Sequence, residues 1–225
     1  MRGLLFGNRS SRRVVLSKMS DTFSDQLCNE AWPIWLRIFQ HPFLTEIKEG
    51  ILPLRKFRYY IIQDSIYLEG FSRAVALAMA KAPDSATLEK LSKRITMPIE
   101  RPLHRKLMPL LGLSEETLRG YKPAPTNLAY INHLIKIASL GSLSTTAGAL
   151  LPCPWTYHLL GGVIGHVDHS VYGTWSSAYV DGLLQESVNA WRSLIDSVAL
   201  YASQEELDGI KEAFITSSRY EFLFW

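Results

Sequence analysis

The stretch "LRKFRYYIIQDSIYLEGFSRAVALAMAKA", residues 54–82, predicts one long α-helix. Its apolar side chains recur at the three- and four-residue spacing that puts them on one helical face, namely Phe57, Ile61, Ile62, Leu68, Phe71, Val75 and Leu77. Pro83 ends the pattern because proline cannot continue an α-helix. Strand-like alternation bounded by two-residue turns is scarce elsewhere in the chain. We therefore predict an all-α fold.

Helical patterning continues on both sides of this stretch. The other predicted helices run from about Asp21 to residue 40 with a bend or restart at Pro33, over 84–111 with a break at 98–102, and over 115–118 behind a Ser114 cap. Three more are predicted over 126–140, 172–202 and 204–225, the last behind a capping box of Ser203 and Glu206. Residues 143–165 lie between the first two of these three. No internal repeat or linker divides these helices. Residues 19–225 are therefore expected to form a single-domain helical bundle behind residues 1–18.

Charge is distributed unevenly along the chain. The net charge is +3, but residues 1–18 hold five basic residues and no acidic one, which leaves 19 basic against 21 acidic residues in the rest. Because this body is nearly neutral, we predict no nucleic-acid partner. Residues 1–18 are compatible with an RNA or membrane arm or a transit-like sequence. We favour a flexible basic leader, or an upstream start ahead of Met19, because a sustained apolar face is lacking.

Cysteine content and hydropathy bear on the cellular compartment. A chain of 225 residues with 47% hydrophobic residues can bury a sizeable core. Cys28 and Cys153 are too few for a disulfide framework and no secretory signal is recognisable, so we predict a cytoplasmic protein. The longest uncharged stretch, residues 137–167, contains two prolines and a Gly161–Gly162 pair. It suits a buried core segment better than a membrane span, and we predict no membrane partner.

The segment "LLPCPWTY", residues 150–157, places Cys153 between two prolines. The residue before a proline avoids the α-region, and proline suits the first helical position, so Cys153 is predicted to be an N-cap or kink residue. There its sulfur would face free N–H groups and the positive end of a helix dipole, which favours a nucleophilic thiolate. The alternative is a buried cysteine that acts as a small hydrophobe, which is also our interpretation of Cys28.

Three helical pairs put one reactive or ionisable group beside one aromatic side chain. They are Asp64 with Tyr67, Cys153 with Tyr157, and Glu221 with Phe224, at spacings of three or four residues. A carboxylate among apolar and aromatic neighbours tends to have a raised pKa, which suits an acid or base near neutral pH. The alternative for each carboxylate is a solvent-facing acid or a structural salt bridge, for instance between Glu221 and Arg219.

Histidines and glycines give no comparable signal for a metal or a phosphate. His166 and His169 could offer two nitrogens, and a helical bundle can hold haem or a metal pair between its helices. However, the Glu-x-x-His pairs of a carboxylate-bridged di-metal bundle are absent, since Glu100 and His104 are four residues apart. The sequence also lacks a phosphate-cradling glycine loop. We therefore predict no metal and no cofactor, with these histidines at the surface or at helix caps.

Five motifs together resemble the TenA family of thiaminase II and aminopyrimidine aminohydrolases. They are "HPF" at 41–43, "QDSIYL" at 63–68, "KPAPTNLAYINHL" at 122–134, "LLPCPWTY" at 150–157 and "SSRYEFLFW" at 217–225. The motifs occur in the order expected of the family, and the resemblance covers about residues 22–225. The Pro-Cys-Pro-Trp element and the C-terminal Tyr-Glu-x-x-Phe-Trp element are its most specific parts.

The resemblance implies a fold like that of haem oxygenase but without haem, a homotetramer, and hydrolysis of aminopyrimidines in thiamin salvage. The implied small-molecule substrates are 4-amino-5-aminomethyl-2-methylpyrimidine and thiamin, and either one gives hydroxymethylpyrimidine. Cys153 matches the nucleophile of the cysteine-bearing subgroup, Glu221 the catalytic glutamate and Asp64 the aspartate that binds the pyrimidine. The aromatic residues that line the pocket are matched by Tyr67, Tyr130, Tyr157, Tyr179 and Phe224.

Two departures from the family pattern affect the expected site. The sequence ends at Trp225, where relatives usually continue for another turn or two of helix, so we expect a more open wall beside Glu221. His158 stands where an aromatic such as tryptophan is common, so local packing or substrate choice is expected to differ. Two other functions stay open at this point: a non-catalytic aminopyrimidine-binding or regulatory protein, and a haem or metal oxygenase of related fold.

Overall fold

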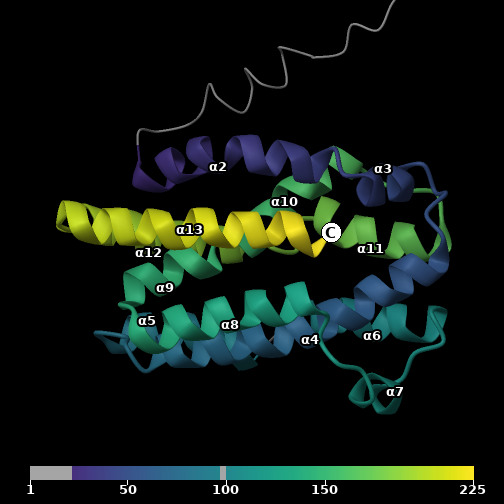
Figure 1. Ribbon diagram of the computed structural model, residues 1–225, viewed down its shortest axis with the longest axis horizontal. Coiled ribbons are helices and arrows are strands. Elements are labelled where there is room, and N and C mark those ends of the chain that lie inside the picture. The colour runs from purple at the N-terminus through teal and green to yellow at the C-terminus, as the bar shows by residue number, and fades with distance from the viewer. Residues whose placement is uncertain (1–21, 97–99) are drawn as a thin grey trace, which may run out of the picture.

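The computed structural model describes residues 22–96 and 100–225, and within these ranges it contains helices and loops but no β-strand (Figure 1). The helices are α2 (Phe23–Phe39), α3 (Pro42–Lys48), α4 (Leu54–Met79), α5 (Ser85–Thr96), α6 (Arg101–Leu110), α7 (Glu115–Arg119), α8 (Pro125–Leu140), α9 (Leu143–Leu150), α10 (Pro152–Ile164), α11 (Ser170–Val180), α12 (Gln185–Ala199) and α13 (Gln204–Phe224). The predicted all-α fold is confirmed. Of the described helices, none is both long and apolar enough to cross a membrane. The leader, 1–18, and the first part of the break predicted at 98–102 lie outside the described residues.

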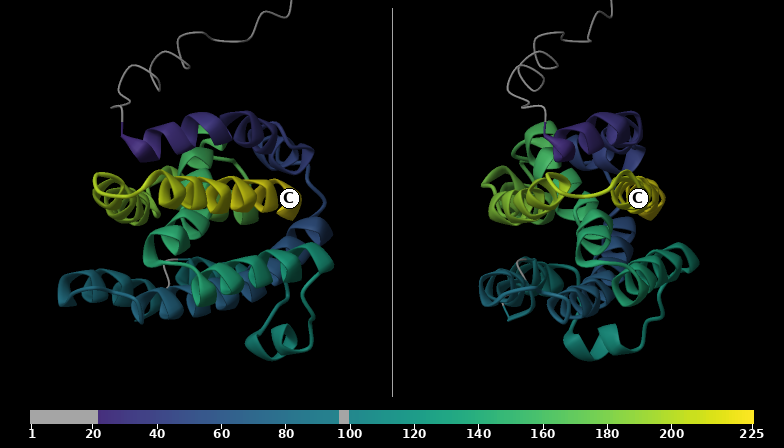
Figure 2. Two further views of the ribbon diagram at one scale, coloured as in Figure 1. Left: turned by 60° about the vertical axis from the view of Figure 1, so that its left-hand side comes forward. Right: turned by 90° about the vertical axis from the view of Figure 1, so that its left-hand side faces the viewer.

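Helix α13 lies in the middle of the bundle. In Figure 1 it runs across the centre of the molecule, with α2 above it and α8 and α4 below, and it packs against α9, α2 and α8. Helix α4 packs against α8 and α5. The turned views of Figure 2 keep this order and show the short helix α7 projecting from the body. One apolar core joins the helices, and its largest side chains include Trp35, Phe57, Tyr130, Trp175 and Phe214.

Two predicted helices differ from the structure. The helix predicted over 172–202 is in fact two helices, because α11 ends at Val180 and α12 begins at Gln185. Between them Gly182 has a φ of +82°, a left-handed conformation that glycine adopts without strain and that breaks an α-helix. The sequence also predicts a bend or restart at Pro33, yet α2 continues through this residue as one helix.

The join between α9 and α10 is buried. Leu151 is the single residue between the two helices, and its N–H donates to the Ala147 carbonyl oxygen at 3.0 Å. A helix that begins inside a core must either provide hydrogen-bond partners for its first N–H groups or begin with residues that lack an N–H group. Pro152 and Pro154 carry none, so two of these groups are missing where α10 starts. Cys153 is predicted to be an N-cap or kink residue, and the N-cap half of this prediction is wrong, because Leu151 takes that position and Cys153 is the second residue of α10.

Two glycines let the long helices approach closely. A Cβ atom at Gly148 of α9 would lie 2.8 Å from the carbonyl oxygen of Ile210 in α13. A Cβ atom at Gly70 of α4 would lie 2.7 Å from the side chain of Ile131 in α8. Larger residues at either position would push the paired helices apart. The close packing of these helices brings their inward side chains together in the core.

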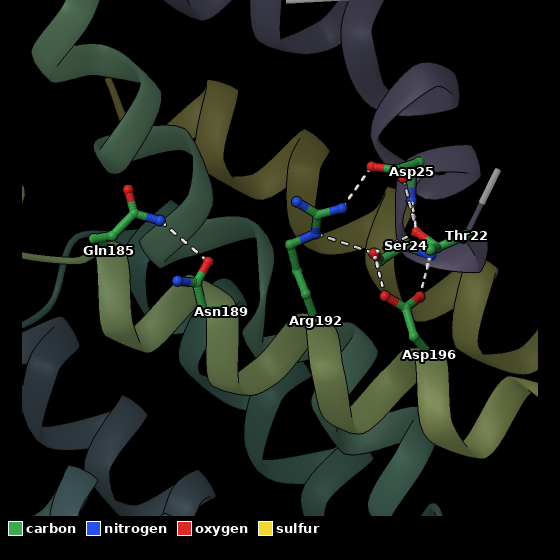
Figure 3. Close-up of polar contacts among 7 residues, drawn as sticks. All are labelled: Thr22, Ser24, Asp25, Gln185, Asn189, Arg192 and Asp196. Atoms are coloured by element: carbon green, nitrogen blue, oxygen red, sulfur yellow. Dashed lines mark hydrogen bonds and ion pairs between the residues drawn. The ribbon is translucent and has the colours of Figure 1, made fainter. Parts of the chain in front are cut away.

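A polar cluster joins α2 to α12 (Figure 3). Arg192 Nη2 lies 2.5 Å from Asp25 Oδ1, and Arg192 Nε donates to Ser24 Oγ at 3.0 Å. Ser24 donates through its N–H and its hydroxyl to the two carboxylate oxygens of Asp196, at 2.7 and 2.9 Å. The Arg192 guanidinium also lies 4.6 Å from the ring centroid of Trp155 in α10. One cation on α12 therefore contacts both α2 and α10.

Replacing Arg192 by methionine should lower the free energy of unfolding by about 1–3 kcal/mol, because the buried Asp25 carboxylate loses its cationic partner. As a control on the same helix, Asn189→Ala removes only an exposed hydrogen bond with Gln185 and should change the free energy by less than about 0.5 kcal/mol. Urea unfolding followed by circular dichroism measures both changes. Equal effects of the two substitutions would contradict the structural role of Arg192.

Candidate active site

The residues to which the family resemblance assigns a role come from α4, α8, α10, α11 and α13. Most of them are at most 6% exposed, namely Asp64, Tyr67, Tyr130, Cys153, Tyr157, Tyr179 and Glu221. Phe224 is partly buried against the core. The ring centroid of Tyr67 lies 5.0 Å from that of Tyr130 and 5.6 Å from that of Phe224. The ring centroids of Tyr157 and Tyr179 are 5.3 Å apart.

Glu221 is a buried carboxyl group on α13. It is 2% exposed, and the Tyr130 hydroxyl donates a hydrogen bond to its Oε1 at 2.6 Å. Burial raises the pKa of Glu221 to about 8; the hydrogen bond from Tyr130 opposes the rise, and the charges of Asp64 and Glu100 add to it. Near neutral pH the group therefore holds its proton and can act as a general acid.

Cys153 is a protonated thiol rather than a thiolate near neutral pH. Burial raises the pKa of the Cys153 thiol well above its ordinary value, and the charges of Glu221 and Glu100 raise it further. The prediction that the start of α10 stabilises a thiolate is therefore wrong. The physical reason is that desolvation and the neighbouring acids outweigh a helix start from which two prolines have removed N–H groups.

Asp64 is held by a histidine that the sequence pattern does not assign to the site. His104 Nε2 lies 2.8 Å from Asp64 Oδ2, and both side chains are 5% exposed. The other ring nitrogen, Nδ1, lies 2.9 Å from Ser65 Oγ. Burial alone would lower the pKa of His104, but the hydrogen bond to Asp64 and the charge of Asp64 raise it above its ordinary value.

Glu100 is a third buried carboxyl group in the cluster. The Tyr179 hydroxyl donates to Glu100 Oε1 at 2.7 Å. Burial raises the pKa of Glu100 to about 7, and the charge of Asp64 contributes to the rise. The sequence suggests Glu100 and His104 only as candidate metal ligands, because the residues that surround them in the fold are distant in sequence. The one signal in the sequence is their four-residue spacing, which fits two neighbours on one helical face.

Aromatic rings close the cluster toward the surface. The ring of Trp225 stacks on that of Tyr60, with centroids 5.3 Å apart and an interplanar angle of 12°, and its centroid lies 5.2 Å from that of Tyr157. The hydroxyls of Tyr60 and Tyr157 are 3.0 Å apart. A groove of about 570 Å³ borders Tyr60, Phe224 and Trp225 from outside. The Tyr67 hydroxyl is buried without a hydrogen-bond partner among the described residues, so it is available to a polar ligand.

The two departures from the family pattern have different outcomes. The expected more open wall beside Glu221 is not seen, because Glu221 is 2% exposed and Trp225 packs on Tyr60 and Tyr157. His158 lies partly buried on α10, where burial lowers its pKa and its Nδ1 has no hydrogen-bond partner among the described residues. Nothing in the structure links His158 to substrate choice.

Histidines elsewhere have structural partners. His169 caps α11, because its Nδ1 accepts hydrogen bonds from the N–H groups of Val171 and Tyr172. His166 Nδ1 lies 3.1 Å from Ser177 Oγ at the surface. Within 22–96 and 100–225, no group of three or more histidine, cysteine, aspartate or glutamate side chains is arranged to hold a metal ion.

Comparison with known proteins relates the chain to one family. A sequence model of the TENA/THI-4/PQQC family matches residues 29–225. The chain is 35% identical to "Aminopyrimidine aminohydrolase" of Halalkalibacterium halodurans, over 91% of this chain and 94% of the relative. It is 30% identical to a TenA homologue from P. horikoshii OT3 of known structure, with a TM-score of 0.82 over 91% of this chain and 96% of that one.

A more distant structure bears on the fold alone. A domain of unknown function from Shewanella denitrificans, described as having a heme oxygenase-like fold, superposes with a TM-score of 0.72 over 91% of each chain. The two sequences are only 15% identical. The expectation of a fold like that of haem oxygenase is therefore confirmed, and this likeness gives no information on chemistry.

The carboxyl group of Glu221 should titrate near pH 8. Tyr130→Phe should raise its pKa further, because it removes a hydrogen bond that stabilises the carboxylate. Tyr220→Phe is the matched control, since Tyr220 stacks on Tyr130 and that bond is kept. Carbon NMR of protein labelled at the glutamate carboxyls follows the titration, and Glu221→Gln assigns the signal. A titration of Glu221 near pH 4.5 would show that burial does not control the group.

Proposed function

The chain belongs to the TENA/THI-4/PQQC family, and on this basis we propose that it hydrolyses aminopyrimidines in thiamin salvage. The proposed reaction converts 4-amino-5-aminomethyl-2-methylpyrimidine and water into the hydroxymethyl compound and ammonia, and the same site would cleave thiamin. The observation that carries the proposal is the buried Cys153 thiol beside Glu221, a carboxylic acid whose pKa is about 8, in an aromatic cluster. The name of the relative from H. halodurans supports the same reaction.

Asp64 is proposed to bind the pyrimidine edge. A carboxylate there can accept hydrogen bonds from the 4-amino group and from a protonated ring nitrogen, and charge makes such bonds strong. The rings of Tyr67 and Phe224 are proposed to hold the pyrimidine between them. These rings are in contact in the structure, so a bound pyrimidine requires Phe224 to move, and the groove beside Phe224 has room for it. Tyr130, Tyr157 and Tyr179 would complete the walls.

Cys153 and Glu221 are proposed to make the ring reactive. Glu221 gives its proton to a ring nitrogen, Cys153 Sγ forms a bond to a ring carbon, and the thiol proton passes to the Glu221 carboxylate. Glu221 then gives this proton to the amine, which leaves the methylene carbon as ammonia while electrons of the ring move into the methylene bond. Water adds to that carbon and returns a proton to the Glu221 carboxylate. The carbon–sulfur bond then breaks, the departing thiolate takes up the proton of the ring nitrogen, and the ring regains its aromaticity. No metal or organic cofactor takes part in these steps.

The high pKa of the Cys153 thiol fits this sequence of events. A thiol that stays protonated in the free protein needs a base at the moment of attack, and Glu221 becomes that base once it has protonated the ring. The transfer keeps the total charge of the buried site constant. A separated thiolate and carboxylate would instead require two negative charges away from water.

We also propose the wider setting of the enzyme. Residues 19–225 would form the catalytic domain behind a flexible leader, in a cytoplasmic homotetramer that binds small molecules but neither nucleic acid nor membranes. Large apolar side chains on the outside, such as Leu200 at 75% and Tyr201 at 90% exposure, offer area that subunits can bury. Light scattering during size-exclusion chromatography measures the subunit number, and a monomer at micromolar concentration would refute the tetramer.

Cys153→Ser and Glu221→Gln should each lower turnover by at least about a hundredfold, the scale expected for loss of a nucleophile or a general acid. Asp64→Ala should mainly raise KM. Cys28→Ser is the matched control, because Cys28 is an equally buried cysteine on α2 and should leave turnover near the wild-type rate. Release of ammonia and hydroxymethylpyrimidine from the aminomethyl compound, run beside thiamin, measures all four variants.

Two outcomes of this assay would count against the proposal. Near-normal turnover by folded Cys153→Ser would exclude the covalent route. A folded wild-type protein that turns over neither compound, but binds hydroxymethylpyrimidine, would favour the binding or regulatory alternative. In that case Cys153→Ser should lose little affinity for hydroxymethylpyrimidine.

A further inference from the structure

His104 and Asp64 form an ion pair between the buried site and an outer groove. Their contact is 2.8 Å from Nε2 to Oδ2, and it joins residues 40 apart in the sequence, on α6 and α4. On its outer side His104 borders a polar groove of about 570 Å³, which Ser65, Arg101 and Arg105 also line. His104 therefore lies between Asp64 and this groove.

Hydrogen-bond directions fix the protons of this pair. The Ser65 hydroxyl has one hydrogen and donates it to the Ile61 carbonyl oxygen at 2.8 Å, so Ser65 Oγ accepts from His104 Nδ1. Nδ1 therefore carries a proton. If Asp64 is ionised, Nε2 must carry a proton as well, and His104 is an imidazolium with both N–H groups bonded.

The charge of Glu100 favours the imidazolium form of His104, whereas the charge of Arg101 opposes it. Glu100 and Glu221 face the cluster from the start of α6 and from α13, and the thiol of Cys153 faces it from α10. Arg101, the residue after Glu100, forms an ion pair with Glu69 at 3.7 Å. The hydroxyl of Tyr179 on α11 donates a hydrogen bond to Glu100. Among the described residues, His104 is thus the cationic group in contact with Asp64.

The free oxygen of Asp64 completes the geometry. Oδ2 contacts His104, whereas Oδ1 has no hydrogen-bond partner among the described side chains and backbone groups. Oδ1 is therefore available to an amino group of a ligand. Without a contacting cation, the buried Asp64 carboxylate would lose its charged partner and would be oriented less firmly.

On the basis of the proposed function, we propose that His104 is a positioning residue, which acts as an imidazolium to hold Asp64 ionised and oriented with Oδ1 toward the aminopyrimidine. His104 does not touch the substrate. Its effect passes through Asp64, and it should therefore appear in substrate binding and in the pH dependence of binding rather than in the chemical step.

His104→Gln tests this role, because glutamine keeps an N–H donor but carries no charge. KM should rise at least about tenfold with kcat within about threefold of wild type, the scale expected when a hydrogen bond to a charged group is lost. In the wild type KM should rise as the pH passes the raised pKa of His104, because the imidazolium is lost, and the variant should lack this pH dependence. His166→Gln is the matched control, because its Nδ1 also contacts a serine hydroxyl, but at the surface.

A second measurement needs neither turnover nor a stable His104 variant. Nitrogen NMR of the wild-type protein labelled at histidine should show one ring with both nitrogens protonated at pH 7.5, and Ser65→Ala should shift that signal, which assigns it to His104. A neutral His104 ring in the folded protein would overturn the proposal, as would a His104→Gln protein with wild-type KM and pH profile. If the wild type shows the imidazolium signal but no turnover, the proposed function fails while the ion pair stands.

Discussion

Burial of several acidic groups in one core is the constraint on which the site depends. Asp64, Glu100, Glu221 and the Cys153 thiol are all at most 8% exposed. Ionising several of these groups away from water is unfavourable unless a cation is in contact with them. The protein resolves this by keeping Glu221 and Cys153 protonated near neutral pH, and by pairing Asp64 with His104. The reactive protons are thus set by burial rather than by any single residue.

The helical packing creates this burial. Helix α13 carries Glu221 through the centre of the bundle, and the close contact at Gly148 draws α9 against it. Because α10 follows α9 after one residue, the same contact controls where Cys153 lies relative to α13. The two prolines beside Cys153 are best explained as structural, since they let a helix begin inside a core with fewer N–H groups to satisfy.

The parts of this structure that depend on local sequence could be predicted, and the parts that depend on distant contacts could not. Apolar periodicity predicts the helix at 54–82 well, and motifs identify Cys153 and Glu221 as candidates. Periodicity misses the turn at Gly182, where a positive φ interrupts a helical pattern. The protonation of Cys153 is missed because acids from other helices decide it. His104 is missed because its partner Asp64 lies 40 residues away.

The pH dependence of kcat/KM between pH 6 and 9 tests most directly the claim that a neutral acid and a neutral thiol act together. Thiamin is the preferred substrate because its thiazolium leaves as a neutral thiazole, so its departure needs no proton. If Glu221 must hold a proton, kcat/KM should fall as the pH rises above about 8, and Glu221→Gln should lose that fall. A rate that keeps rising up to pH 9, as a preformed thiolate would give, would contradict the account.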